Sequence, residues 1–110
     1  MRAGDIVRVD LGIRVGSEPG FQRPAIVVTA DVVLASNPRT VHVVPVTTNI
    51  ARALPSEVRI DAGLDRPSVA QCHLCAVVST ERIIDGPGGH IGAVALAQLR
   101  AVIADLLDIG

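Results

Sequence analysis

Aromatic residues are almost absent from this sequence, which contains no Trp, no Tyr and one Phe. Proteins that read unpaired nucleic-acid bases usually stack them on aromatic rings, so Phe21 is the one aromatic side chain available for that purpose. The alternative for Phe21 is an ordinary place in the hydrophobic core. The scarcity of aromatic residues therefore excludes an extended stacking surface.

Lysine is also absent, and all ten basic residues are Arg. The formal net charge of −1 argues against a domain that binds nucleic acid broadly through a basic surface. The planar guanidinium of Arg nevertheless suits phosphates and base edges, so local binding of RNA stays open. A genome rich in G and C, whose codons favour Arg, explains the same bias without any function.

Long apolar runs are missing too. Every run is interrupted by Pro, Gly or a charged residue before it reaches roughly 18 residues, so we expect no membrane-spanning helix. The residues up to Asp5 contain no apolar signal core, and we expect a cytoplasmic protein. The chain has 110 residues, 49% of them hydrophobic, which is enough for one folded domain spanning residues 1–110.

The hydrophobic pattern predicts several short strands. In residues 5–11, alternate positions predict a half-buried strand, with Val7, Val9 and Leu11 on one face and Ile6, Arg8 and Asp10 on the other. Further strands are predicted at residues 25–30, 40–46, 57–60 and 68–79, the last as one strand or as two divided near Cys72. Turn-forming residues predict connections at residues 12–22, 31–39, 47–55, 63–67 and 85–89.

The period changes at the C-terminus. Apolar residues recur there at steps of three and four, which predicts one amphipathic helix over residues 94–107; they are Leu96, Leu99, Ile103, Leu106 and Leu107. Strands followed by a single helix indicate a mainly-β fold, in which a small antiparallel β-barrel carries a packed C-terminal helix.

Two short motifs place polar groups beside buried strands. The first runs Gly16-Ser17-Glu18 and then Phe21-Gln22-Arg23-Pro24, and the second is Pro45-Val46-Thr47-Thr48-Asn49. Together with the opening Gly4-Asp5-Ile6-Val7, they resemble the MazF/PemK toxins of toxin–antitoxin modules over nearly the whole chain. That resemblance implies an SH3-like barrel of the MazF/CcdB type that forms a homodimer.

The same resemblance implies an activity and a partner. Toxins of this family are endoribonucleases that cut single-stranded RNA without a metal, leaving a 2′,3′-cyclic phosphate and a 5′-hydroxyl. We therefore expect no metal and no other cofactor. The expected partner is an acidic MazE-like antitoxin whose disordered tail covers the RNA groove.

Arg23 and Thr47 are the main catalytic candidates. RNA is cleaved when its 2′-hydroxyl attacks the neighbouring phosphate, so an enzyme has to position that attack and stabilise the developing charge. Pro24 holds Arg23 in an extended backbone, and the Thr47 hydroxyl can donate to a phosphate oxygen. Taken alone, each residue fits an ordinary role equally well: an Arg paired with a carboxylate, and a Thr that closes a turn. The resemblance implies that they are the catalytic pair.

Six further residues are candidates for the site. Glu18 matches the acidic residue of the family's Gly-Ser-Glu motif and could orient Arg23 or accept the 2′-hydroxyl proton; the alternative is a solvated loop acid. The predicted RNA-binding residues are Ser17, Phe21, Thr48, Arg8 and His73. Arg8 occupies a strand position where the family often has an aromatic residue, and His73 could equally be structural.

One segment departs from the family. Leu74, Ala76 and Val77 stand where these toxins often have Gln, a basic residue and Thr or Ser, so we expect altered cleavage specificity. The neighbouring Cys72 and Cys75 supply too few ligands for a closed zinc site, and we expect them to be small core residues. The Gly-rich residues 86–92 match neither a phosphate-binding loop nor a dinucleotide motif and are predicted to be a hairpin-like connection.

Two alternatives to a ribonuclease remain open. A non-catalytic toxin of the same fold, like the CcdB proteins that trap gyrase, would make Arg23 and Thr47 dispensable. The C-terminal residues 107–110 lack the Trp typical of CcdB-like chains, which disfavours this reading. A binding module that keeps the fold and has lost cleavage is the other alternative, slightly favoured by the departures at residues 74–77.

Overall fold

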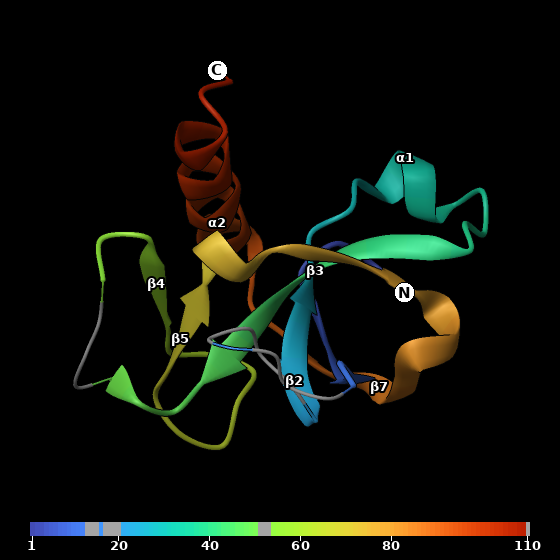
Figure 1. Cartoon of the computed structure of the whole chain (residues 1–110), viewed down its shortest axis with the longest axis horizontal. Coiled ribbons are helices and arrows are strands. Elements are labelled where there is room, and N and C mark those ends of the chain that lie inside the picture. The colour runs from blue at the N-terminus through green and yellow to red at the C-terminus, as the bar shows by residue number, and fades with distance from the viewer. Residues whose placement is uncertain (13–15, 17–20, 51–53, 110) are drawn as a thin grey trace.

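The computed structural model describes residues 1–12, 16, 21–50 and 54–109 (Figure 1). The strands are β1 (Asp5–Asp10), β2 (Gln22–Val27), β3 (Thr40–Thr47), β4 (Glu57–Ile60), β5 (Ser68–Gln71), β6 (Ala76–Ser79) and β7 (Ile83–His90). The helices are α1 (Asp31–Leu34) and α2 (Ala93–Leu106), with 3₁₀ turns η2 (Cys72–Leu74) and η3 (Thr80–Arg82). The predicted mainly-β fold with a C-terminal helix is confirmed.

The strands form one antiparallel sheet in the order β4-β5-β3-β2-β1-β7. The edge of β3 that faces away from β2 pairs with β6 along its first residues and with β5 along its last. Among the described residues, the end strands β4 and β7 do not pair with each other. The predicted barrel is therefore corrected to a barrel-like sheet that hydrogen bonds do not close.

The central strands are buried on both faces, which creates two hydrophobic cores. The core under α2 contains Ile6, Ile26, Val44, Leu96 and Leu99, and the core under α1 contains Val7, Val9, Val27, Val41 and Leu34. Alternate residues of one strand point to opposite faces, so β1 and β2 contribute to both cores. The prediction of a half-buried β1 was wrong at Ile6, which is buried because α2 covers that face.

The prediction of a turn at residues 85–89, and of a hairpin-like connection at 86–92, was also wrong. These residues belong to β7, which pairs with β1 through an irregular register: Asp85 lies opposite Arg8 and Gly89 opposite Ile6. A Cβ atom at Gly89 would lie 2.5 Å from the Gly63 carbonyl oxygen. The glycines thus serve a close approach of two backbones, and an edge strand with bulges tolerates Pro87.

Three other elements refine the predicted pattern. The predicted turn at residues 31–39 contains α1, whose Asp31 carboxylate accepts from the Ala3 backbone N–H at 2.7 Å. The predicted strand over residues 68–79 is two strands separated by η2. Cys72 is buried, as expected, whereas Cys75 is only half-buried. No helix in the described ranges is both long and apolar enough to cross a membrane.

Candidate functional site

Arg23 and Thr47 lie on neighbouring strands. Arg23 is the second residue of β2, and Thr47 is the last residue of β3. The recorded β2–β3 register pairs Ala25 with Pro45. Arg23 lies two residues before Ala25 and Thr47 lies two residues after Pro45, so both lie beyond the same end of this ladder, and Arg23 pairs with Val9 on β1. The geometry therefore brings the two predicted catalytic residues to one end of the same strand pair.

The local contacts of Arg23 and Thr47 suit binding of an anion. Among the described residues, no carboxylate oxygen lies within 4.0 Å of the Arg23 guanidinium. The Oγ1 atom of Thr47 accepts from the Asn49 backbone N–H at 3.2 Å. Because this bond uses a lone pair of the oxygen, the hydroxyl proton stays available for donation to a phosphate oxygen.

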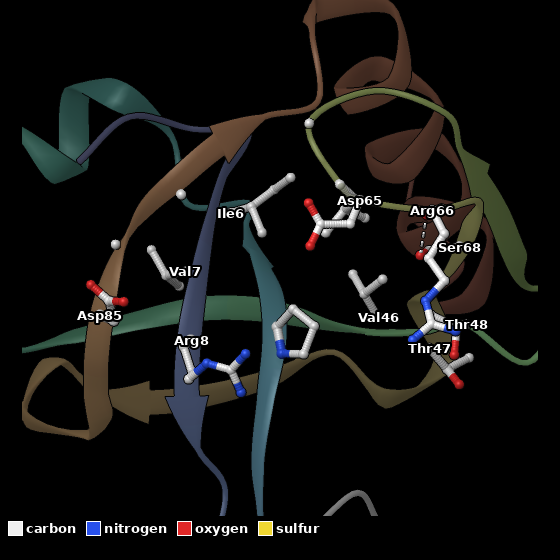
Figure 2. A pocket seen from close by; sticks show the side chains of 15 residues that line it. Ile6, Val7, Arg8, Val46, Thr47, Thr48, Asp65, Arg66, Ser68 and Asp85 are labelled. Carbon is white, nitrogen blue, oxygen red and sulfur yellow. Dashed lines mark hydrogen bonds between the residues drawn. The ribbon is translucent and has the colours of Figure 1, made fainter.

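An open cavity of about 390 Å³ adjoins Thr47. Its polar lining consists of two Arg, two Asp and three hydroxyl residues, contributed by Arg8, Thr47, Thr48, Asp65, Arg66, Ser68 and Asp85 (Figure 2). Arg8 and Pro24 are register partners on β1 and β2, and both line the cavity. Arg23 precedes Pro24 on β2, so its side chain points to the opposite face of the strand, and it is not among the lining residues. Of the predicted site residues, Arg8, Thr47 and Thr48 therefore line the same cavity, and Arg23 does not.

Phe21 lies exposed just before β2. Its side chain is 70% exposed, so the alternative of a core position is wrong. Two backbone hydrogen bonds hold it at the end of the β1–β2 ladder: Phe21 N–H donates to Gly12 at 2.6 Å, and its carbonyl accepts from Leu11 at 2.9 Å. Its φ of 59° lies in the left-handed region. Ser17 and Glu18 lie outside the described residues.

His73 belongs to a different groove. Its Nδ1 lies 3.1 Å from the Ser56 hydroxyl oxygen, and its neighbours line a groove of about 430 Å³ along β6. This groove also contains the three departures from the family pattern, Leu74, Ala76 and Val77, together with Leu11 and Arg82. The structure therefore does not bring His73 into the cavity that contains Thr47 and Arg8.

Sequence reasoning missed Arg66, Asp65 and Ser68. Asp65 and Arg66 come from the segment between β4 and β5, which was predicted only as a turn, and Ser68 is the first residue of β5, within a predicted strand. Ser68 is buried, and its hydroxyl donates to the Arg66 carbonyl oxygen at 2.9 Å. The signal was present in the sequence, because Arg66-Pro67 repeats the Arg-Pro pair of the first motif.

The cysteines are poorly suited to ligate a metal. Burial raises the pKa of the Cys72 thiol to about 11, with a smaller contribution from neighbouring Cys75, and burial also raises the pKa of Cys75. Thiols bind metals as thiolates, which these environments disfavour. Across the described ranges, no group of three or more His, Cys, Asp or Glu residues could hold a metal ion.

Comparison with known proteins shows one consistent likeness. Residues 2–109 match a family model described as PemK-like, MazF-like toxin of type II toxin–antitoxin system. The chain is 40% identical over 116 residues to endoribonuclease MazF9 of Mycobacterium tuberculosis, covering 99% of this chain and 98% of that protein. It is 35% identical over 89 residues to endoribonuclease EndoA of Bacillus subtilis, covering 77% and 76%. The crystal structure of MazF from Deinococcus radiodurans superimposes with a TM-score of 0.85 at 25% identity, covering 99% and 97%.

Proposed function

The chain belongs to the family of PemK-like, MazF-like toxins of type II toxin–antitoxin systems, and from this membership we propose that it is an endoribonuclease toxin. Its relatives MazF9 and EndoA are both named endoribonucleases. The proposed activity is sequence-specific cleavage of single-stranded RNA without a metal, which inhibits translation and growth. The relatives' names favour this activity over that of a CcdB-like gyrase poison.

In the proposed reaction, the 2′-oxygen of one ribose attacks the adjacent phosphorus, and the bond from phosphorus to the 5′-oxygen breaks. The products are a 2′,3′-cyclic phosphate and a 5′-hydroxyl. Arg23 stabilises the charge that develops on the phosphate oxygens, because its guanidinium stays protonated. Thr47 donates its hydroxyl proton to the same group. Glu18 accepts the 2′-hydroxyl proton or, if it only orients Arg23, water accepts that proton. The leaving 5′-oxygen takes a proton from water.

The observation that carries this proposal is the strand register. Arg23 and Thr47 each lie two residues beyond the Ala25–Pro45 pair, at the same end of the β2–β3 ladder. A rigid β-ladder can hold two such groups in the geometry that a phosphorane needs, without the entropy cost of ordering a loop. The available Thr47 hydroxyl proton and the absence of a close carboxylate near Arg23, among the described residues, suit the same chemistry.

The rest of the substrate needs contacts on either side of the cut. We propose that Ser17, Thr48 and Arg8 bind the RNA backbone or bases near Thr47. Exposed Phe21 supplies a stacking surface for an unpaired base. His73 binds the RNA farther along, in the groove beside β6. The apolar residues of that groove predict a cleavage specificity different from that of relatives with polar residues there.

We further propose the molecular setting of the toxin. A MazE-like antitoxin with an acidic tail neutralises it, as the family name implies for a toxin–antitoxin system. The toxin acts as a homodimer, which the mean hydropathy of +0.47 and several exposed apolar side chains support. Its site of action is the cytoplasm, where its RNA substrate is found.

Cleavage of a mixed-sequence RNA in excess EDTA tests the catalytic assignment. Wild-type protein should produce fragments with 5′-hydroxyl ends, and the Arg23→Ala and Thr47→Ala variants should lose about a hundredfold in rate or more. Matched controls are Arg59→Ala, whose guanidinium bonds Asp61 at 3.1 Å, and Thr40→Ala, an exposed residue at the start of β3. Both controls should cut at the wild-type rate.

Two results would contradict the proposal. Folded wild-type protein that leaves all RNA intact but still binds its antitoxin would identify a binding module. Wild-type cleavage rates in both Arg23→Ala and Thr47→Ala would remove these residues from the reaction while leaving the ribonuclease activity in place.

A further inference from the structure

Arg66 is held at the cavity rim by a well-anchored loop. The loop follows β4, and its backbone is fixed by the 2.9 Å bond from the buried Ser68 hydroxyl to the Arg66 carbonyl. Pro67 further restricts the Arg66 backbone to extended conformations. Figure 2 shows the Arg66 side chain extending toward Thr47 and Thr48. Its guanidinium therefore projects from a defined point on a rigid support.

The charge of Arg66 is available to a ligand. Two carboxylates, Asp65 and Asp85, also line the cavity, but in the described part of the chain neither lies within 4.0 Å of the Arg66 or Arg8 guanidinium. Arg59 is the contrasting case, because its Nε lies 3.1 Å from an Asp61 oxygen. Arg66 is thus an exposed cation beside two hydroxyl groups, an arrangement suited to a tetrahedral anion.

We propose that Arg66, with the Thr48 hydroxyl, binds a backbone phosphate of single-stranded RNA next to the phosphate that is cut. Arg8 lies across the cavity from Arg66 (Figure 2), and it binds the strand on that opposite wall. The inference rests on the proposed ribonuclease function, because it assumes that the cut phosphate lies at Thr47. The cavity is open, and its lining runs from β7 to the β4–β5 loop, so an RNA strand that crosses it would contact both walls.

Arg66 acts in binding rather than in bond breaking. It comes from the loop between β4 and β5, whereas Arg23 lies on β2 and is not among the residues that line the cavity. Its removal should therefore raise KM, while kcat changes by only a few-fold. A residue that stabilised the transition state alone would instead lower kcat and leave KM unchanged.

The test measures binding to an RNA that cannot be cut. A mixed-sequence oligonucleotide with 2′-O-methyl groups lacks the attacking hydroxyl, and its dissociation constant is measured over a range of KCl concentrations. Arg66→Ala should bind roughly tenfold more weakly at low salt. The slope of log K against log salt should fall in magnitude by about 0.7, the value for one phosphate contact on a single strand. Arg66→Lys should keep the slope and recover part of the affinity.

Arg59→Ala is the matched control, because it removes the same charge from an exposed site outside the cavity. It should bind with the wild-type affinity and slope. An unchanged affinity and slope for Arg66→Ala would overturn the inference. Weaker binding of Arg66→Ala with an unchanged salt slope would also overturn it, because it would indicate a contact with a base. An equal loss of affinity in Arg59→Ala would overturn it as well, because it would indicate a general effect of charge.

The same cationic cavity could instead bind an acidic protein segment. Binding of a polyglutamate peptide tests this alternative. If Arg66→Ala loses binding to the peptide but not to the oligonucleotide, the cavity binds an acidic protein segment and the inference is wrong. The outcome is separate from that of the proposed function, because binding of the uncut oligonucleotide needs no catalysis. A wild-type protein that cuts RNA while Arg66→Ala behaves normally would retain the function and discard only the role of Arg66.

Discussion

The immediate neighbours of a side chain in this protein determine whether its polar atoms are available to a ligand. Thr47 accepts a backbone N–H and so keeps its proton for a ligand, while Arg66 is anchored by its own carbonyl and leaves its guanidinium exposed. Cys72 shows the opposite situation, because it is buried in the core under α2 and its thiolate is disfavoured. Thr47 and Arg66 therefore keep polar groups available for a ligand, whereas Cys72 is a core residue.

The raised pKa of Cys72 predicts a loss of stability at alkaline pH. Burial raises its pKa from 9.0 to about 11, so the folded state keeps the proton that the unfolded state releases earlier. This contribution to stability is complete below pH 9 and is lost as the pH rises from 9 to about 11. Urea unfolding should show a steeper fall over this interval in wild type than in Cys72→Ala. Equal slopes in the two proteins would show that Cys72 does not carry the effect.

At the scale of elements, the strands are shaped by what covers each face. The inner parts of β1, β2 and β3 are buried on both faces, because α2 packs on one core and α1 on the other. β7 differs, because it lies at the sheet edge and its glycines meet the turn after β4 at backbone distance. That approach joins the two ends of the sheet without a hydrogen-bonded ladder.

The two neighbouring glycines of β7 make this packing testable. A Cβ at Gly89 would lie 2.5 Å from the Gly63 carbonyl oxygen, whereas at Gly88 the nearest such atom, the Ile6 carbonyl oxygen, is 3.9 Å away. Gly89→Ala should therefore lower the free energy of unfolding by roughly 1–3 kcal/mol. Gly88→Ala should change it by less than about 0.5 kcal/mol. Chemical denaturation measures both, and equal effects would show that the turn moves away without cost.

At the scale of the whole molecule, one apolar surface is left uncovered. A groove of about 510 Å³ lies between the α1 region and α2, with Val33, Ile103 and Ile109 among its lining residues. Val33 and Ile109 are 45% and 61% exposed. Exposed apolar side chains of this kind suit the proposed contact with a second copy of the chain.

This surface predicts how the proposed homodimer is disrupted. Wild type should sediment at twice the monomer mass, and a charge at Ile109 or Val33 should shift the equilibrium toward monomer because an unpaired carboxylate would be desolvated. The matched control is Val94→Asp, at the opposite end of α2 and outside the groove. It should remain dimeric. A dimer that persists in Ile109→Asp and Val33→Asp would place the interface elsewhere.

Much of the fold follows from local pattern. Alternation located β1, β3 and β4, and the three-to-four-residue period located α2 within one residue at each end. Both depend on which side chains repeat along a single element, and that information is contained in the sequence. The Arg-Pro and Pro-x-Thr-Thr motifs lie at the same end of the β2–β3 ladder, on either side of the Ala25–Pro45 pair.

Contacts between distant segments determined the rest. Residues 85–89 have the composition of a turn, and only their pairing with β1 and their approach to Gly63 make them a strand. Arg66 enters the cavity beside Thr47 because β5 pairs with the end of β3, a contact between residues that are far apart in sequence. His73 is separated from that cavity for the same reason, because η2 turns the chain toward a different groove. The sequence by itself determined most of the elements, except α1 and β7, and the catalytic candidates, whereas the tertiary structure alone decided which polar groups share a cavity. Local period carries no information about partners across the sheet, so that choice could be made only by the packed fold.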